Sequence, residues 1–167
     1  MSATLDISIS GVQELANKLE SATKEKVIKD SLTSGALLVT GWVKKNRLTG
    51  PRPGFLGVLT GRLRSSIAAG PVDRTGNQYT VAIGTNVKYA KIHEFGGIIR
   101  PRNKPFLAWK GPGGKYIFTQ KPVVMPARPF FRPAIEDQGN RAEVLNILVT
   151  RINRALEGES IGRQAVS

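Results

Sequence analysis

The chain has 167 residues, enough for a single domain with an apolar core, since a domain of this length buries about 70% of the surface that its unfolded chain exposes. It has one histidine and no cysteine, which excludes disulfides and thiolate chemistry and leaves any zinc site to be completed by carboxylates. The net charge of +13 is concentrated in residues 41–132, which hold seventeen Lys and Arg and two acidic residues, while the two flanks together carry −2. Such a basic middle points to nucleic acid or to an acidic protein partner, with a solvated surface as the plainer alternative.

The N-terminal region predicts a strand followed by two helices. Apolar and polar residues alternate over residues 5–9, as in a half-buried strand. Ser10 can then cap a helix that carries apolar residues at helical spacing as far as Ala22, and Gln13 completes a capping box. A second, long helix shows the same spacing from Val27 to Val43.

Residues 46–57 predict an exposed loop. Two prolines and three glycines crowd into this segment, which also carries Arg47 and Arg52. Neither helix nor strand can continue through such a composition, and long structureless connections in compact domains are usually functional.

The middle of the chain predicts an antiparallel meander. A strand ends near Val72, a turn over residues 74–77 leads into a clean alternation over residues 79–83, and further strand-like runs follow on both sides of the glycine-rich turn at residues 111–114. That turn is not a phosphate-binding loop, because Tyr116 stands where Ser or Thr is required and Trp109 stands at the first glycine position.

A short helix over residues 89–95 interrupts this meander and contains His93 and Glu94. The pair cannot open a zinc-protease motif, because Gly97 occupies the position of the second histidine. The spacing of Tyr89, Ile92 and Phe95 predicts that these three side chains are buried and that His93 and Glu94 lie on the other face, bonded to neighbours or to another chain. A hydrolase that uses His93 and Glu94 is the third of three functional hypotheses.

The C-terminal part predicts an irregular segment and then a helix. Pro126 and Pro129 forbid regular helix around them, and Pro133 suits a first helical turn. Leucine and isoleucine at helical spacing then predict an amphipathic helix that Gly158 ends, leaving residues 159–167 as a flexible tail. The expected architecture is one α+β domain over residues 1–158: an antiparallel meander with two N-terminal helices, a short inserted helix and a C-terminal helix.

Three segments stand out in order along the chain, at residues 59–67, 84–97 and 126–134, the last reading Pro-Ala-Arg-Pro-Phe-Phe-Arg-Pro-Ala. Together they resemble the successive signatures of the phage virion morphogenesis family, the tail-completion or head-to-tail joining proteins of tailed bacteriophages. The resemblance covers residues 59–135. It implies a virion protein of the neck or upper tail, made in the bacterial host cytoplasm, with neither catalysis nor cofactor.

The resemblance also implies a ring, usually of six subunits, that contacts neighbouring neck and tail proteins and lets genomic DNA pass through its centre without sequence recognition. Different faces of one subunit must complement each other in such a ring. The expected contact residues are Tyr89, His93, Glu94, Phe95, Arg128, Phe130 and Phe131. Of these, Phe95 and one of the two adjacent phenylalanines are better explained as core. Because successive residues of an extended chain point opposite ways, the other phenylalanine should point outward and is the interface candidate.

The basic loops give the second hypothesis, a nucleic-acid-binding module. Residues that would face DNA or an acidic partner are Arg47, Arg52, Arg100, Arg102, Lys104, Lys110 and Lys115. Tyr79, Trp109 and Tyr116 lie among the basic residues and could stack on bases, although their places on predicted strands also fit a packed core. No apolar run is long enough for a membrane span, and the first residues lack the pattern of a signal peptide, so no membrane association is expected.

Overall fold

The fold is that of a computed structural model of the chain, which describes residues 2–5, 17–19, 21–50, 56–58, 60–76 and 78–164. Its helices and antiparallel strands confirm the α+β class. In chain order the elements are β1 (Ser2–Leu5), α2 (Ser21–Asn46), α3 (Arg62–Ser66), β2 (Ala68–Thr75), β3 (Gln78–Gly84), α4 (Ala90–Phe95), β4 (Gly97–Ile99), β5 (Leu107–Lys110), the 3-10 turn η1 (Pro112–Gly114), β6 (Tyr116–Thr119), β7 (Val123–Met125), α5 (Arg132–Glu136) and α6 (Gln138–Gln164).

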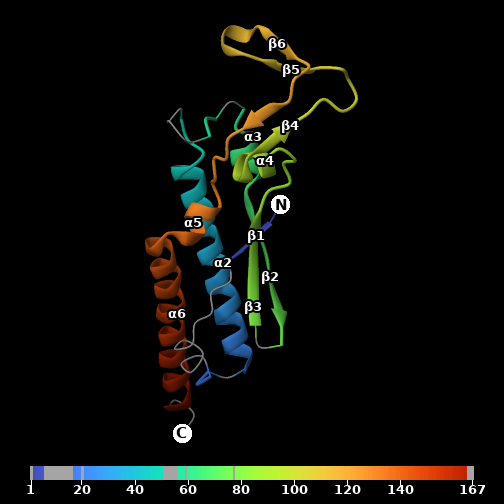
Figure 1. Cartoon of the computed structure of the whole chain (residues 1–167). Coiled ribbons are helices and arrows are strands. Elements are labelled where there is room, and N and C mark those ends of the chain that lie inside the picture. Colours follow the sequence, from blue (N-terminus) through green and yellow to red (C-terminus); the bar gives the residue numbers. More distant parts are fainter. Residues whose placement is uncertain are drawn as a thin grey trace.

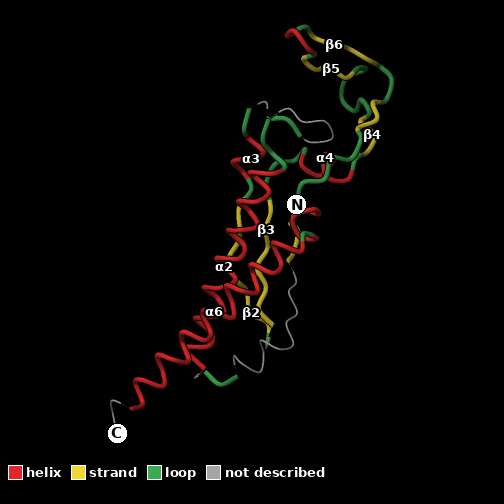
Figure 2. The backbone as a smooth tube through the Cα atoms, turned by 90° about the vertical axis from the view of Figure 1, so that its left-hand side faces the viewer, coloured by secondary structure: helices red, strands yellow, loops and turns green. Residues whose placement is uncertain are grey.

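Three layers form the body of the molecule. The antiparallel sheet has the order β1-β3-β2, with Ser2 opposite Gly84 and Leu5 opposite Val81. The long helix α2 lies along this sheet, and α6 runs beside α2 (Figures 1 and 2). We use "the body" for these three strands and two helices.

The body is built around an apolar core. Val39 and Val43 of α2 are buried together with Val81 and Ile83 of β3. On the other side of α2, Gly35 allows α6 to approach so closely that a β-carbon at this position would lie 2.9 Å from Cγ1 of Val144. Gly35 is therefore the point of closest approach that these contacts show between α2 and α6.

The remaining strands form two further small sheets, where the sequence predicted one continuous meander. β4 pairs with β7, and β5 pairs with β6. Together, residues 97–125 make a two-stranded projection that leaves the body at one end (Figure 1), which we call the arm. The proline-containing segments on both sides of the β5–β6 hairpin break the pairing, because proline cannot donate to a strand ladder.

Three boundaries differ from those predicted, and the predicted exposed loop is partly buried. Most of the first predicted helix lies outside the described residues, but residues 17–19 form a turn and α2 begins at Ser21, so this helix does not run to Ala22. Residues 62–66 form helix α3 ahead of β2. α6 continues through Gly158 to Gln164, because an exposed glycine with helical dihedrals weakens a helix without ending it. In the predicted exposed loop, Leu48 and Leu56 are buried.

Candidate functional site

Helix α4 presents an unexpected face to the protein interior. Ala90 and Glu94, one turn apart, are buried, whereas Tyr89 and Phe95 are exposed. The prediction that Tyr89, Ile92 and Phe95 form the buried stripe is therefore wrong for the two aromatic residues. What orients the helix is a polar contact with a distant segment.

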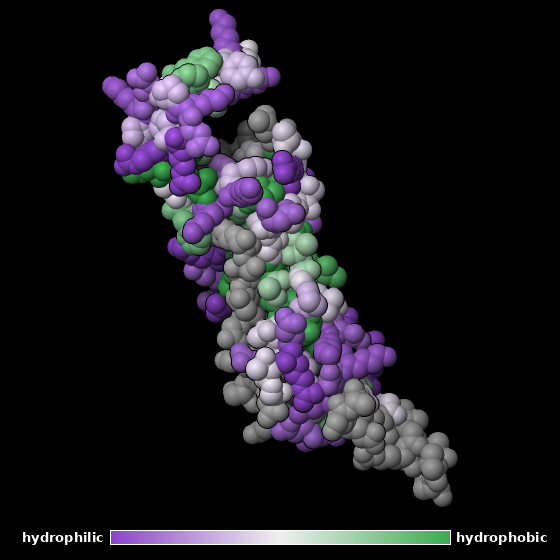
Figure 3. All heavy atoms as spheres, turned by 90° about the vertical axis from the view of Figure 1, so that its right-hand side faces the viewer, coloured by the Kyte–Doolittle hydropathy of each residue, from purple (hydrophilic) through white to green (hydrophobic). Residues whose placement is uncertain are grey.

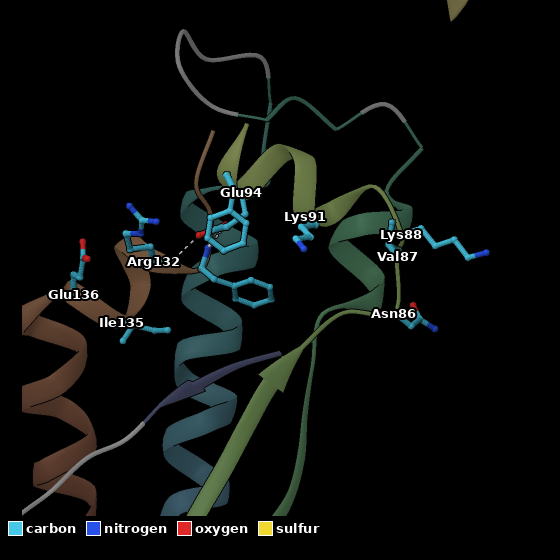
Figure 4. A pocket seen from close by; sticks show the side chains of 10 residues that line it. Asn86, Val87, Lys88, Lys91, Glu94, Arg132, Ile135 and Glu136 are labelled. Carbon is cyan, nitrogen blue, oxygen red and sulfur yellow. Dashed lines mark hydrogen bonds between the residues drawn. The ribbon is translucent and has the colours of Figure 1, made fainter. Parts of the chain in front are cut away.

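Glu94 makes that contact. Its side chain is only 2% exposed, and its Oε2 accepts hydrogen bonds from the backbone N–H groups of Phe130 (2.8 Å) and Phe131 (3.0 Å), while Oε1 accepts one from Arg132 (2.9 Å). Figure 4 shows the carboxylate reaching from α4 to the start of α5. The first N–H groups of a helix lack partners within the helix and attract negative charge. Glu94 supplies that acceptor from another part of the chain.

Further contacts fasten the same two segments. The carbonyl oxygen of His93 accepts a hydrogen bond of 2.7 Å from the N–H of Arg128. Gly96 has a φ of +70°, and a β-carbon there would lie 2.9 Å from the backbone nitrogen of Ala127. We call α4 together with residues 126–136 the junction. It joins two of the three segments on which the family resemblance was based.

The remaining segment, residues 59–67, contacts residues 84–97 through hydroxyl groups. Ser66, at the end of α3, and the buried Thr85 have their hydroxyl oxygens 2.6 Å apart. The Thr85 hydroxyl also accepts a hydrogen bond from the N–H of Val87. All three sequence segments therefore meet in space.

Phe130 and Phe131 are both buried, with their ring centroids 4.7 Å apart. The prediction that one of them points outward is wrong, because the backbone of Phe131 is helical (φ −85°, ψ −51°) and does not alternate. Both side chains, like that of Glu94, are enclosed within the subunit. Of the predicted contact residues, Tyr89, Phe95 and Arg128 are exposed and accessible to a partner.

His93 is half-buried, and its ring meets that of Tyr89 edge to face, with centroids 5.7 Å apart. Burial, and then the positive charge of Arg128, lower its pKa below the ordinary value. Its buried Nδ1 has no hydrogen-bond partner among the described residues. A histidine base needs a group that orients it, and the neighbouring carboxylate of Glu94 is occupied by three backbone N–H groups instead.

Metal binding finds no support in the part of the chain described here. Within it, no group of three His, Asp or Glu residues lies close enough to hold a metal ion. Likewise, no helix among the described residues is long and apolar enough to cross a bilayer.

The predicted basic residues divide between two places. Arg100, Arg102, Lys104, Lys110 and Lys115 are all exposed on the arm. Arg47 lies apart from them, with its guanidinium 5.5 Å from the ring centroid of Trp42, and Arg52 lies outside the described residues. Figure 3 shows the surface of the arm, where hydrophilic side chains surround exposed apolar ones.

A groove between α4 and α5 was not predicted from the sequence. Its volume is about 650 Å³. It is lined by Asn86, Val87, Lys88, Lys91, Glu94, Phe95, Phe131, Arg132, Ile135 and Glu136. The sequence feature that could have indicated this groove is the spacing of Lys88, Lys91 and Phe95, which suits one side of a short helical turn. The groove itself forms only because α5 lies beside that side.

The fold and the junction define a small α+β protein whose buried polar cluster is structural and whose cationic end carries uncovered apolar surface. A family model described as "Bacteriophage HK97-gp10, putative tail-component" matches residues 10–96. This is more than half of the chain, which therefore belongs to the HK97-gp10-like family of phage tail components. The match includes the first of the three segments and all but the last residue of the second, and it ends before the third. No curated protein and no solved structure matches the chain.

Proposed function

We propose that this tail component is a tail-completion or neck protein that assembles into a ring of six subunits at the junction of head and tail, with DNA passing through the centre. Family membership supports the more general part of this proposal, that the chain is a structural phage tail protein. The observation that carries the proposal further is the arm, whose apolar surface a single subunit leaves uncovered.

Both faces of the β5–β6 hairpin carry exposed apolar side chains. Trp109 lies opposite Ile117 in the register, and Phe118 lies opposite Ala108, so large side chains project from each face. Phe118 is 61% exposed and Tyr116 is 62% exposed. A two-stranded hairpin is only marginally stable alone, and exposed apolar patches of this kind usually mark contact surfaces.

The base of the arm continues this surface. Ile98 and Val124 are partners in the β4–β7 register and are both largely exposed. Tyr89 and Phe95, exposed on the adjoining junction, lie at the same end of the molecule. In a closed ring each subunit contacts its two neighbours through different surfaces. The arm would form one of them, with Tyr89, Phe95 and Arg128 as candidates for contacts at its base.

Native mass spectrometry of the full chain, with electron microscopy of purified particles, tests the ring. The double substitution Trp109→Ser and Phe118→Ser should abolish the oligomer and leave the unfolding of the subunit nearly unchanged. Leu37→Ser is the matched control, since this exposed residue lies on α2 of the body. A chain that is absent from virions and stays monomeric with its neighbouring tail proteins would contradict the ring.

Nucleic-acid binding by the arm is a second candidate function. Trp109 and Tyr116 are exposed, contrary to the core role that their strands suggested, whereas Tyr79 packs against the core. Lys110 places its ammonium 5.7 Å from the ring centroid of Tyr116. The arm carries six Lys and Arg and no acidic residue. Exposed aromatic rings between cations are suited to nucleic acid, and the cations to its phosphates.

Salt dependence distinguishes this candidate. Binding of a random-sequence DNA duplex should weaken steeply between 50 and 200 mM salt, on the order of tenfold or more. Replacing Lys110 and Lys115 with Gln should reduce that slope, whereas replacing Lys24 and Lys26 at the far end of α2 should not. Absence of binding at the lowest salt would exclude the arm as a DNA contact and leave the ring proposal standing.

A further inference from the structure

We infer that the groove between α4 and α5 is a docking site for an acidic segment of another protein, with an apolar side chain beside the carboxylate. This inference concerns a single subunit and goes beyond the proposed ring. Its starting point is the combination of an apolar floor with a rim of cations that have no ion-pair partner among the described residues.

The floor and one wall of the groove are apolar. Phe131 and Val87 are buried side chains that reach its surface, and Ile135 is half-buried beside them. Phe95 stands at the same groove with 54% of its surface exposed. A partner that covered this ring would remove apolar area from water, which is the main favourable contribution to most associations.

The rim is cationic and lacks compensation within the described chain. Lys88, Lys91 and Arg132 are exposed, and no described carboxylate lies within ion-pair distance of any of them. In Figure 4, Lys91 points from α4 toward the hollow, whereas Lys88 extends outward. Glu94 does not neutralise them by ion pairing, since both its oxygens accept backbone N–H groups. Three cations and two carboxylates, Glu94 and Glu136, line the groove, so its lining keeps a net charge of +1.

The occupant follows from charge and chemistry. Metal ions are disfavoured by the three cations, and a DNA backbone offers no apolar group to cover Phe95. The arm of a second copy is also a poor complement, because it carries six Lys and Arg and no acidic residue. A carboxylate next to an aromatic or aliphatic side chain satisfies both the rim and the floor.

The test uses the full-length protein and two tetrapeptides, acetyl-Glu-Phe-Glu-Leu-amide and acetyl-Lys-Phe-Lys-Leu-amide. NMR titration should show that the acidic peptide binds more tightly and shifts amide signals within residues 86–95 and 131–136. Lys91→Glu should weaken this binding about tenfold, and Phe95→Ala about fivefold, because each removes one of the two matched features. Lys110→Glu and Phe118→Ala, exposed on the arm, are controls that should leave it unchanged.

Four results would overturn the assignment. The basic peptide could bind as well as the acidic one, or Lys91→Glu could have no effect while unfolding of this variant remains normal. A short DNA duplex could shift the groove signals where the acidic peptide does not, which would assign the groove to nucleic acid. Finally, the same signals could change when the protein alone is diluted, which would assign it to a second copy. The peptide and DNA results leave the ring proposal as it stands, whereas the dilution result would be evidence for self-association through the groove.

Discussion

Along α2, apolar side chains meet α6 on one side and the sheet on the other, whereas at the junction a single carboxylate meets three backbone N–H groups. The body is built around an ordinary apolar core. Its ion pairs join Glu25 to Lys29 and to Arg74, and they lie at the surface. The junction has two buried phenylalanines and Glu94, and it supports an arm whose side chains remain largely exposed. Packing of apolar side chains stabilises the body, whereas backbone geometry and the buried charge of Glu94 stabilise the junction.

This difference relates to function. A body of packed helices and strands can be stable by itself, while the junction must hold the arm and the groove in fixed positions for partners. Hydrogen bonds to a buried charge are directional and stronger than neutral ones. Substitutions in the two regions should therefore be costly for different reasons, and the following comparisons measure that contrast.

The largest effect is expected at the junction from Glu94→Ala. Removing the carboxylate leaves three N–H groups without an acceptor, at about 1–3 kcal/mol for each buried donor, partly relieved by entering water. We expect a loss of about 3–5 kcal/mol in the free energy of unfolding, measured by urea denaturation.

The matched control for Glu94→Ala is Glu136→Ala, an exposed carboxylate on α5 for which about 0.5 kcal/mol or less is expected. Glu94→Gln keeps one acceptor oxygen and should lie between the two. Equal midpoints for Glu94→Ala and Glu136→Ala would show that the carboxylate does not stabilise the junction.

The next effect compares two glycines with similar dihedrals, one in each region. Gly96 at the junction has a φ of +70°, and an added β-carbon would lie 2.9 Å from the backbone nitrogen of Ala127. Gly76, in the β2–β3 turn, has a φ of +61° and open space. Alanine in this conformation costs about 1–2 kcal/mol, so Gly76→Ala should lose about that amount in thermal unfolding.

Gly96→Ala should lose about 1–2 kcal/mol more than Gly76→Ala, because backbone atoms cannot move aside as a side chain can. If the two substitutions were equally costly, the close approach at the junction would have no energetic importance.

The sequence predicted the body better than the junction. The long helix and the β2–β3 hairpin follow from periodicity and from the turn at residues 74–77, both of which are local properties. The short helix α4 was also predicted, from the same spacing that placed its aromatic residues inside. That spacing could not reveal which face is buried, because the deciding acceptors and donors lie thirty-six or more residues apart.

The arm shows a second limit of sequence patterns. Alternation in Trp109, Tyr116 and Phe118 indicates strands, but it cannot state whether a second layer covers them. Here the hairpin extends beyond the body, and the side chains that would be core in a larger sheet are exposed. For the same reason the cationic residues 100, 102, 104, 110 and 115 could be listed from the sequence but not placed together on one projection.

In the body, we expect smaller effects on stability, and the space around each added β-carbon should determine their sign. Gly35→Ala would place a β-carbon 2.9 Å from Val144, so the helix-propensity gain of about 1 kcal/mol is opposed by overpacking of about 1–3 kcal/mol. A net loss of about 0.5–2 kcal/mol is expected in urea denaturation. Gly41→Ala, in the same helix with nothing within 4 Å, should instead stabilise by about 0.5–1 kcal/mol.

The volume explanation for Gly35 can be separated from backbone effects by adding Val144→Ala. If the β-carbon and the valine methyl groups compete for one space, the double substitution should cost less than the sum of the two single ones. Strict additivity would mean that the α2–α6 contact adjusts without strain.

The smallest effect expected is the pH dependence contributed by His93 at the junction. Burial, and secondarily Arg128, lower its pKa in the folded chain, so the unfolded chain binds a proton first as the pH falls below about 6.5. The free energy of unfolding should then decrease with falling pH in this window, with no contribution above it. His93→Gln should flatten the slope between pH 7.5 and 5, and Arg128→Gln should flatten it less, because the charge is the weaker of the two causes. Equal slopes in wild type and His93→Gln, measured by urea denaturation at each pH, would show that the imidazole is hydrated and that the junction tolerates its charge.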